Sequence, residues 1–370
     1  MRDLGLLTSL EDIIVKTEVK FKNSGIEIGL YTLGDISKDP LSGRKISAEQ
    51  RMKEIIEAAK LADEAGLDLF GVGEHHRLDY AVSATPVMLA AISQQTKQIK
   101  LTSATTVLST VDPVRLYEDF ATLDLLSDGR AEIIAGRGAF LESFPLFGFE
   151  TKDYDALFSE NIDLFLQLNK HEQITWEGRF RSSLHNAEIA PRPLQREIPI
   201  WIGVGGTKES AVRAGHLGVG MAVVILDGDP SRFQPLVDIY RKAGLEAGHN
   251  PQQLQVAVTG HGYIAKTSKQ AKEEFYPYYA HYKTSVYEQR GMEYTLSRAD
   301  YDQMVGTDSA LFVGSPEEIA EKILRQYELF HHQRFIAQID IGGIPFEKVA
   351  KGIELLATEV APIVRKATSR

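Results

Sequence analysis

From residue 26 onward, short apolar runs rich in β-branched residues alternate with longer stretches whose apolar positions recur every three or four residues. The short runs are typical of buried strands and the longer stretches of amphipathic helices. We expect eight strands, at 26–31, 67–71, 99–107, 131–135, 200–202, 219–225, 256–264 and 335–341. This βα alternation predicts an α/β fold with a parallel sheet, which is either a single (β/α)8 TIM barrel or an open doubly wound sheet.

The number of units favours the closed barrel. Neither a break in composition nor a Pro-, Gly- or Ser-rich linker interrupts the chain, and a (β/α)8 barrel of about 200 to 400 residues would use all of its 370 residues. We therefore expect one domain over 26–370, preceded by an N-terminal extension over 1–25. Within the extension, 9–21 is expected to be partly helical, with Ser9 and Asp12 placed like a capping pair.

The stretches between the strands carry apolar faces with helical spacing. Two such faces are formed by Ile55, Ala58, Ala59 and Ala62 and by Leu116, Phe120, Leu123 and Leu126. We expect both faces to pack on the sheet and to have no role in chemistry.

Two connections are longer than the ~2 to 6 residues usual in such units, and we expect them as insertions after the fourth and seventh strands. The first carries Phe140, Phe144, Phe147 and Phe149. These rings either wall an apolar pocket or pack the loop down. The second carries Tyr276, Tyr278, Tyr279, Tyr282, Tyr287, Tyr294 and Tyr301. It is either a lid or an additional helical hairpin whose tyrosines cover the barrel flank.

Composition removes several classes of function. The 41 basic and 51 acidic residues give a net charge of −10, which disfavours nucleic acid and an anionic membrane surface as partners. The chain has no cysteine, so disulfides, a thiolate nucleophile and cysteine-based metal sites are excluded. Its longest apolar run, 221–226, is far shorter than the ~20 residues of a membrane-spanning helix, and charges interrupt the first 25 residues. We expect a cytoplasmic protein.

A first candidate for chemistry follows the second strand, in the run Gly73-Glu74-His75-His76. The carboxyl ends of parallel strands form the ligand-binding face of α/β proteins, and a histidine there can transfer protons near neutral pH. Consecutive side chains point in opposite directions, so only one of the two histidines can face a ligand. The alternative is a packed histidine without a chemical role. The spacing is not that of a zinc motif, and we expect no metal.

Two further candidates could bind an anion. Arg137 lies between glycines at the end of the fourth strand, where its guanidinium could hold a phosphate; alternatively it pairs with Glu142. The turn Gly205-Gly206-Thr207 leads from the fifth strand into a helix and could present its N–H groups to a phosphate. The turn matches neither the dinucleotide-binding nor the Walker pattern, which disfavours both kinds of nucleotide site.

The order of several motifs resembles that of the bacterial luciferase-like family of flavin-dependent monooxygenases and oxidoreductases. Those motifs are Gly73-Glu74-His75-His76, 102–108, Asp112-Pro113-Val114-Arg115, Glu118-Asp119, 125–130 and Gly136-Arg137-Gly138, followed by 199–203, 314–318 and 338–343. The resemblance thus spans nearly the whole expected barrel. It implies a (β/α)8 fold that binds FMN, usually in the reduced form (FMNH2) delivered by a separate flavin reductase, and reacts with O2.

The resemblance also assigns residues. It implies that His75 is the catalytic histidine beside the flavin, that Glu74 lies near the cofactor, and that Ala104-Thr105 forms a non-proline cis peptide under the ring. Gly136 and Ala139 would line the ring, Arg137 would bind the phosphate, and Gly205, Gly206 and Thr207 match the phosphate loop more loosely. Light-emitting members carry a cysteine at the position of Gly136, which argues against luciferase activity in this chain.

We therefore expect an FMN-dependent monooxygenase acting on a small, mostly apolar organic substrate, with His75 moving a proton. One alternative is a dehydrogenase that uses the deazaflavin F420, because some relatives in the family do so. The other is a protein that holds flavin without turnover. The family often forms dimers, so a homodimer is possible.

Overall fold

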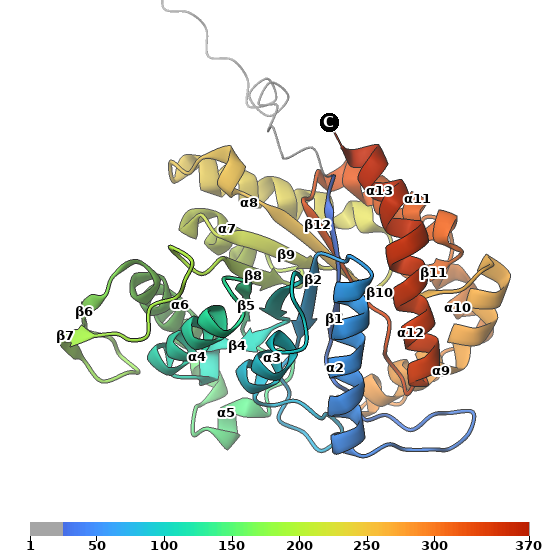
Figure 1. Ribbon diagram of the computed structural model, residues 1–370, viewed down its shortest axis with the longest axis horizontal. Coiled ribbons are helices and arrows are strands. Elements are labelled where there is room, and N and C mark those ends of the chain that lie inside the picture. Colours follow the sequence, from blue (N-terminus) through green and yellow to red (C-terminus); the bar gives the residue numbers. More distant parts are fainter. Residues whose placement is uncertain (1–24, 370) are drawn as a thin grey trace, which may run out of the picture.

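The computed structural model describes residues 25–369 and contains a closed parallel barrel (Figure 1). Hydrogen bonds join its eight strands in the order β1-β2-β3-β5-β8-β9-β10-β12, and β12 pairs with β1 to close the ring. These strands are β1 (Glu27–Thr32), β2 (Leu69–Val72), β3 (Lys100–Ser103), β5 (Ala131–Gly136), β8 (Ile200–Val204), β9 (Gly220–Val224), β10 (Val256–Ile264) and β12 (Arg334–Gln338). The prediction of a TIM barrel over an open sheet is confirmed, with all eight strands at the expected places.

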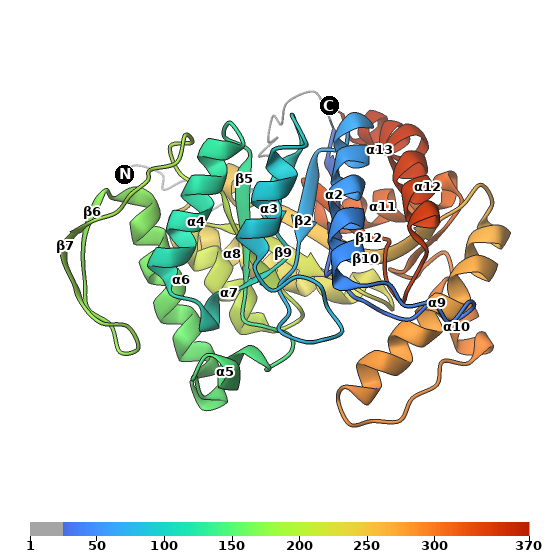
Figure 2. The same cartoon turned by 60° about the horizontal axis from the view of Figure 1, so that its bottom comes forward.

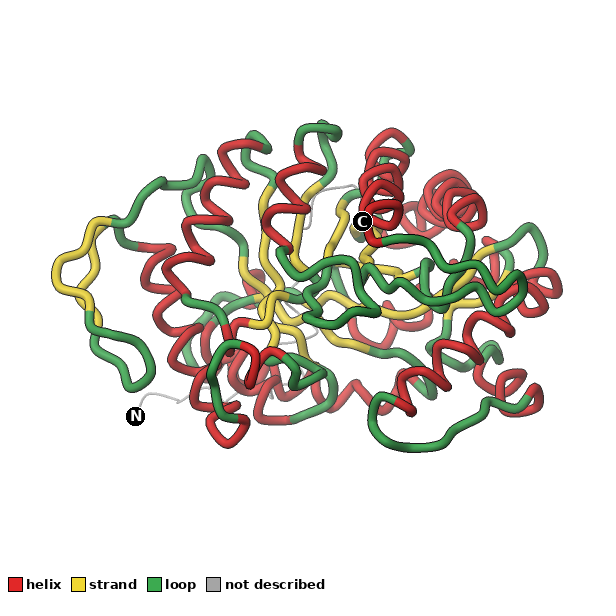
Figure 3. Tube along the Cα trace, turned by 90° about the horizontal axis from the view of Figure 1, so that it is seen from below, coloured by secondary structure: helices red, strands yellow, loops and turns green. Residues whose placement is uncertain are grey.

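Helices surround the strands, which lie at the centre when the molecule is viewed along the direction of Figure 3. They are α2 (Ala48–Glu64), α3 (Thr85–Ser93), α4 (Pro113–Leu126), α5 (Ser143–Leu146), α6 (Tyr154–Lys170), α7 (Lys208–Leu217), α8 (Gln234–Glu246), α9 (Ser268–Glu288), α10 (Arg298–Met304), α11 (Pro316–Phe330), α12 (Phe346–Leu355) and α13 (Ala361–Thr368). Within the described residues, no helix is both long and apolar enough to span a membrane. The helix expected over 9–21 lies outside the described residues.

Local sequence signals explain where the first helices begin. The Ser47 hydroxyl caps α2 by accepting a hydrogen bond from the Gln50 N–H. Asp112 caps α4 in the same way, and Pro113 occupies the first helical position, where its missing N–H costs nothing. The predicted apolar faces of both helices are buried except for Leu126, which is 48% exposed. This prediction was wrong for Leu126, which is the last residue of the helix.

The third predicted strand, 99–107, is divided in two. β3 pairs with both β2 and β5, whereas β4 (Thr106–Val107) pairs with β5 alone, and the two residues between them form the expected cis peptide Ala104-Thr105. The chain therefore leaves β2 at this peptide but stays beside β5. A single continuous strand was the wrong prediction because an apolar run does not reveal such a break.

Three strands outside the ring were not predicted. β11 (Phe312–Gly314) pairs with β10, and the hairpin of β6 (Gln173–Trp176) and β7 (Leu184–Glu188) projects from one side of the molecule (Figure 3). Most side chains of the hairpin are exposed or only half-buried, so its apolar alternation is weak. Strands that cover no core leave little trace in the pattern.

Both predicted insertions are present at the carboxyl ends of the barrel strands, which we call the mouth. α5 belongs to the first and α9 and α10 to the second, and they extend beyond the barrel at the same end (Figure 2). Phe144 is fully buried and stacks on Tyr154, so it packs the first insertion down. In the second, Tyr278, Tyr279 and Tyr301 are buried. The second insertion is thus helical, with these tyrosines packed inside it, as the helical alternative predicted.

At the opposite end of the barrel, where the strands begin, four charged side chains form what we call the base network: Glu27, Lys100, Glu132 and Arg334. Arg334 lies 2.6 Å from carboxylate oxygens of both Glu27 and Glu132, and Lys100 lies 2.6 Å from Glu27 and 3.3 Å from Glu132. Burial raises the pKa of Glu132, but Arg334 and Lys100 outweigh this effect and hold it below its ordinary value. The four charges of the base network thus neutralise one another.

Candidate active site

His75 follows β2 at the mouth and is 9% exposed. Its ring stacks on Tyr80 at 4.1 Å between centroids and meets the edge of Phe140 at 5.4 Å. Its Nδ1 lies 3.4 Å from the Glu142 carboxylate. Burial raises the pKa of Glu142, but the contact with His75 and hydrogen bonds from the backbone N–H groups of Glu142 and His76 together outweigh this effect and lower the pKa overall. An oriented imidazole with a carboxylate on one nitrogen is suited to proton transfer through the other.

The neighbouring histidine points to different partners. His76 Nε2 lies 2.8 Å from the Glu74 carboxylate, and its ring meets the edge of Phe147 at 4.9 Å. The second carboxylate oxygen of Glu74 accepts a hydrogen bond from the Val107 N–H. Glu74 therefore links the β2 loop to β4, and two phenylalanines of the first insertion each contact one histidine, Phe140 contacting His75 and Phe147 contacting His76.

Glycines leave room for Ala104 and Thr105 between the strand ends. A Cβ on Gly71 would lie 2.9 Å from the Ala104 side chain, and one on Gly136 would collide with the Thr105 hydroxyl. A Cβ on Gly203 would lie 3.2 Å from the Thr105 methyl group. These glycines at the ends of β2, β5 and β8 therefore allow the two residues to form the floor of the mouth.

Arg137 and the β8–α7 turn come together beside this floor. The Arg137 guanidinium donates hydrogen bonds to the hydroxyls of Thr207 (3.2 Å) and Ser210 (2.8 Å) and forms an ion pair with Asp155. We call the group of Arg137, Gly205, Gly206, Thr207 and Ser210 the anion cradle. It does not contain Glu142, the alternative partner of Arg137, because Glu142 lies at His75 instead.

The cradle has the properties of a phosphate site. α7 begins at Lys208, so its unpaired N–H groups and positive dipole end face the same region. A Cβ on Gly205 or Gly206 would meet nothing within 4 Å, which leaves open space beside the backbone. The guanidinium and two hydroxyls supply the donors that a phosphate needs. The residues present thus fit the phosphate end of FMN. Arg137 itself is paired with Asp155.

The predicted site residues therefore lie in one continuous arc. Thr105 lies between Gly136 and Gly203, and the strands that carry these glycines lead directly into Arg137 and Gly205. Of the predicted set, Ala139 is exposed on the first insertion. No group of three or more His, Asp or Glu side chains within residues 25–369 is placed to hold a metal ion.

Several polar residues of the mouth escaped the sequence analysis. His261 on β10 is 1% exposed; burial lowers its pKa to about 4, assisted by Lys283, so the ring is neutral at pH 7. Its Nδ1 has no hydrogen-bond partner, and its ring meets the edge of Tyr282 at 5.1 Å. A histidine near the carboxyl end of a strand is the signal that singled out His75, and it could also have found His261. Asp35 and Tyr80, which lie in loops after β1 and β2, carried no such signal.

A closed parallel barrel with a histidine and an anion cradle at its mouth is the architecture of a TIM-barrel enzyme. The chain matches the model of the luciferase-like monooxygenase family over residues 26–333 and belongs to this family. The family contains flavin-dependent monooxygenases and F420-dependent enzymes, and the protein is an oxidoreductase of this type.

Among its relatives, the chain is 24% identical to the oxygenase component of a flavin-dependent trigonelline monooxygenase from Acinetobacter baylyi, over 86% of this chain and 92% of the relative. It is 30% identical to an F420-dependent glucose-6-phosphate dehydrogenase from Kineococcus radiotolerans, over 58% and 65%. The fold is shared with a monooxygenase from Streptomyces bottropensis (TM-score 0.79, 24% identity, 91% of this chain and 99% of that one). It is also shared with the FMN-bound oxygenating constituent of a diketocamphane monooxygenase from Pseudomonas putida (TM-score 0.73, 22% identity, 91% and 98%).

Proposed function

We propose that the protein is an FMN-dependent monooxygenase that uses reduced flavin from a separate reductase and O2 to oxidise a small organic substrate. The observation that carries the proposal is the anion cradle beside the glycine-bounded floor, within reach of the loop that holds His75. When bound, the flavin supplies the redox chemistry and activates oxygen. Support for flavin over F420 comes from the curated relatives, since the flavin-dependent one matches over 92% of its length and the F420-dependent one over 65%.

The roles of the residues follow from their contacts. Arg137, Thr207, Ser210 and the N–H groups of the Gly205-Gly206 turn bind the phosphate, and Ala104-Thr105 with Gly136 support the ring. Glu142 favours the tautomer of His75 that carries its proton on Nδ1, which leaves Nε2 to exchange a proton with substrate. Phe140 and Tyr80 flank the imidazole and exclude water from it.

The test is a pair of binding titrations, with FMN and with F420, followed by measurement of oxygen uptake when a flavin reductase supplies reduced FMN. We expect FMN to bind more tightly and oxygen uptake to respond to substrate. Tighter binding of F420, with hydride transfer and no oxygen uptake, would identify an F420-dependent dehydrogenase instead. FMN binding without turnover of any substrate in a broad screen would support the flavin-holding alternative.

A further inference from the structure

A cavity lies at the mouth, lined by Tyr80 and by none of the residues of the anion cradle. Its volume is about 160 Å³, and it lies between the β1–α2 loop, the β2–α3 loop and α9. Tyr80 belongs to both places, because it lines this cavity and also stacks on His75. The Tyr80 ring therefore separates a molecule in the cavity from His75, the proposed proton-transfer group.

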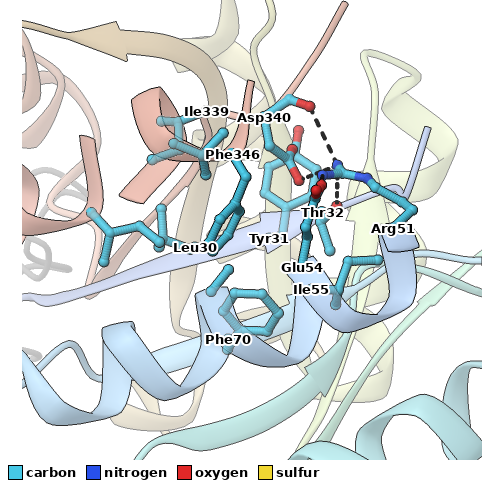
Figure 4. A pocket seen from close by; sticks show the side chains of 13 residues that line it. Leu30, Tyr31, Thr32, Arg51, Glu54, Ile55, Phe70, Ile339, Asp340 and Phe346 are labelled. Atoms are coloured by element: carbon cyan, nitrogen blue, oxygen red, sulfur yellow. Dashed lines mark hydrogen bonds and ion pairs between the residues drawn. The ribbon is translucent and has the colours of Figure 1, made fainter. Parts of the chain in front are cut away.

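Asp35 gives the cavity a negative charge that is compensated only in part. Its side chain is 11% exposed, and the donors nearest to its carboxylate, the Ser37 hydroxyl and the Gly342 N–H, do not reach hydrogen-bonding geometry. Its nearest cation is Arg51, whose guanidinium lies 3.8 Å away, but Arg51 is 2.6 Å from Asp340 and 3.8 Å from Glu54. Figure 4 shows Arg51 turned toward Asp340 and Thr32. Three carboxylates thus share one guanidinium, and Asp35 lies farther from it than Asp340 does.

Besides Asp35, the ionisable side chains that line the cavity are Lys38, Asp79, Tyr80, His281 and Tyr282, and neither Lys38 nor Asp79 supplies the missing positive charge. Asp79 is already held by Arg77 at 2.9 Å and by the Gln289 amide N–H. Lys38 is exposed, and its side chain lies over the Gly43 turn, where a Cβ on that glycine would be 3.6 Å from Lys38 Cε. Burial raises the pKa of Asp35 and Asp340 adds to the rise, while Arg51, the Ser37 hydroxyl and the Gly342 N–H oppose it without cancelling it.

The remaining walls suit a cation better than a neutral molecule. Tyr80 and Tyr282 both line the cavity, and the faces of aromatic rings attract positive charge. The Gln289 carbonyl oxygen is buried and has no hydrogen-bond partner, so it offers a further acceptor. Carboxylate, aromatic faces and a free acceptor are the groups with which proteins bind ammonium centres.

We infer that this cavity binds a positively charged nitrogen of the substrate, either a quaternary ammonium or a protonated amine. The inference rests on the proposed function, since it makes the cavity the substrate side of the same mouth. It refines the expectation of a mostly apolar substrate: the charged end lies against Asp35, and the part to be oxidised extends past Tyr80 toward His75.

The test uses a matched pair of probes, choline and its neutral isostere 3,3-dimethylbutan-1-ol, which differ in charge but hardly in shape. Binding to the full-length protein is measured by calorimetry and by the shift in melting temperature. We expect choline to bind about tenfold more tightly than the isostere or better, because only choline supplies the missing charge. Equal affinity for the two probes, or binding of neither, would overturn the inference.

Variants locate the binding. Asp35→Asn should abolish the preference for choline, whereas Asp39→Asn should keep it, because Asp39 is on the same loop but does not line the cavity. If Asp35→Asn does not fold, Tyr282→Leu takes its place and should weaken choline binding about threefold or more by removing one aromatic wall. An unchanged preference in whichever variant folds would contradict the inference.

The same variants distinguish this inference from the proposed function. FMN affinity is measured for each, and we expect Asp35→Asn to leave it unchanged because Asp35 lies outside the anion cradle. Loss of the choline preference with FMN binding intact supports both proposals. Choline binding in a protein that takes up no FMN would support the cavity as a cation site and would contradict the proposal that FMN is the cofactor.

Discussion

The two ends of the barrel treat buried charge in opposite ways. At the base, Glu27, Lys100, Glu132 and Arg334 form a network in which every charge has an opposite charge within 3.3 Å. At the mouth, Asp35 has no cation closer than 3.8 Å within the described residues.

This difference separates stabilising groups from binding groups on one scaffold. A buried polar or charged group without a partner is costly, so folded proteins pair such groups wherever nothing else demands otherwise. The four charges of the base network follow that rule, because each has an opposite charge as its partner. The mouth departs from it at Asp35, His261 and Gln338, where a ligand can supply what the protein does not. Unpaired polar atoms at the mouth therefore mark ligand sites more clearly than their residue types do.

The largest effect is expected from breaking the base. Arg334→Met should lower the free energy of unfolding by about 3–5 kcal/mol, because it leaves Glu132 buried without its main partner. Urea denaturation measures this, with Lys53→Met as control, since the exposed Lys53–Glu49 pair should contribute less than about 1 kcal/mol. FMN affinity should not change. A loss as small as that of the control would show that the network does not stabilise the fold.

The second effect concerns the mouth and should spare stability. His75→Ala should lower turnover about 100-fold or more, as expected for removal of a proton-transfer group, while FMN affinity stays within a few fold. Steady-state kinetics with the coupled reductase and a flavin titration measure the two quantities separately. His76→Ala is the matched control, because His76 faces Glu74 and Phe147. Unchanged turnover in His75→Ala would remove it from the mechanism.

The third effect is on cofactor binding. Arg137→Ala should weaken FMN binding by about 1.5–3 kcal/mol, the contribution of a charge-assisted contact with phosphate. Asp155→Asn should do the opposite and tighten binding, because Asp155 competes for the same guanidinium. Neither change should affect riboflavin, which lacks the phosphate. A similar loss for riboflavin in Arg137→Ala would place Arg137 away from the phosphate.

The smallest effect is a change in the pH dependence of stability, with opposite signs at the two ends. The pKa of Glu132 is lowered by folding, so its contribution to stability is complete above the ordinary value of 4.5 and is lost as the pH falls through the lowered pKa. The pKa of Asp35 is raised by burial, so the folded state loses stability as the pH rises from the ordinary value toward the raised one.

Two variants separate these contributions. Glu132→Leu combined with Arg334→Met should flatten the loss of stability in acid, whereas Asp35→Asn should raise stability at neutral pH relative to wild type. Denaturation curves recorded across the acid range measure both. Parallel pH profiles for all three proteins would show that neither carboxyl titrates differently in the folded state.

The architecture could be predicted because it depends on repeated local signals. The buried strands and the caps at Ser47 and Asp112 each agree with the fold they build. The break in the third strand at Ala104-Thr105 was not visible in the residues, and the family resemblance pointed only to the cis peptide there. The exposed hairpin of β6 and β7 was missed because its side chains cover no core.

The site was predicted in part for a similar reason. His75, Arg137 and the Gly205-Gly206-Thr207 turn lie at strand ends, and strand ends can be read from the sequence. Asp35, Tyr80 and Tyr282 come from two loops and a helix, and only the folded chain brings them around one cavity. Ion pairs between loops depend on three-dimensional packing. The alternative that paired Arg137 with Glu142 was therefore wrong, because Glu142 lies at His75 and Arg137 pairs with Asp155.

Tyr80 has a consequence for selectivity because its ring touches both the cavity and the imidazole of His75. A molecule that fills the cavity restricts how far this ring can tilt, and thereby steadies the histidine that rests against it. A compound that fits loosely should bind adequately and yet react slowly. Discrimination between substrates would then be found in the rate of the chemical step rather than in affinity.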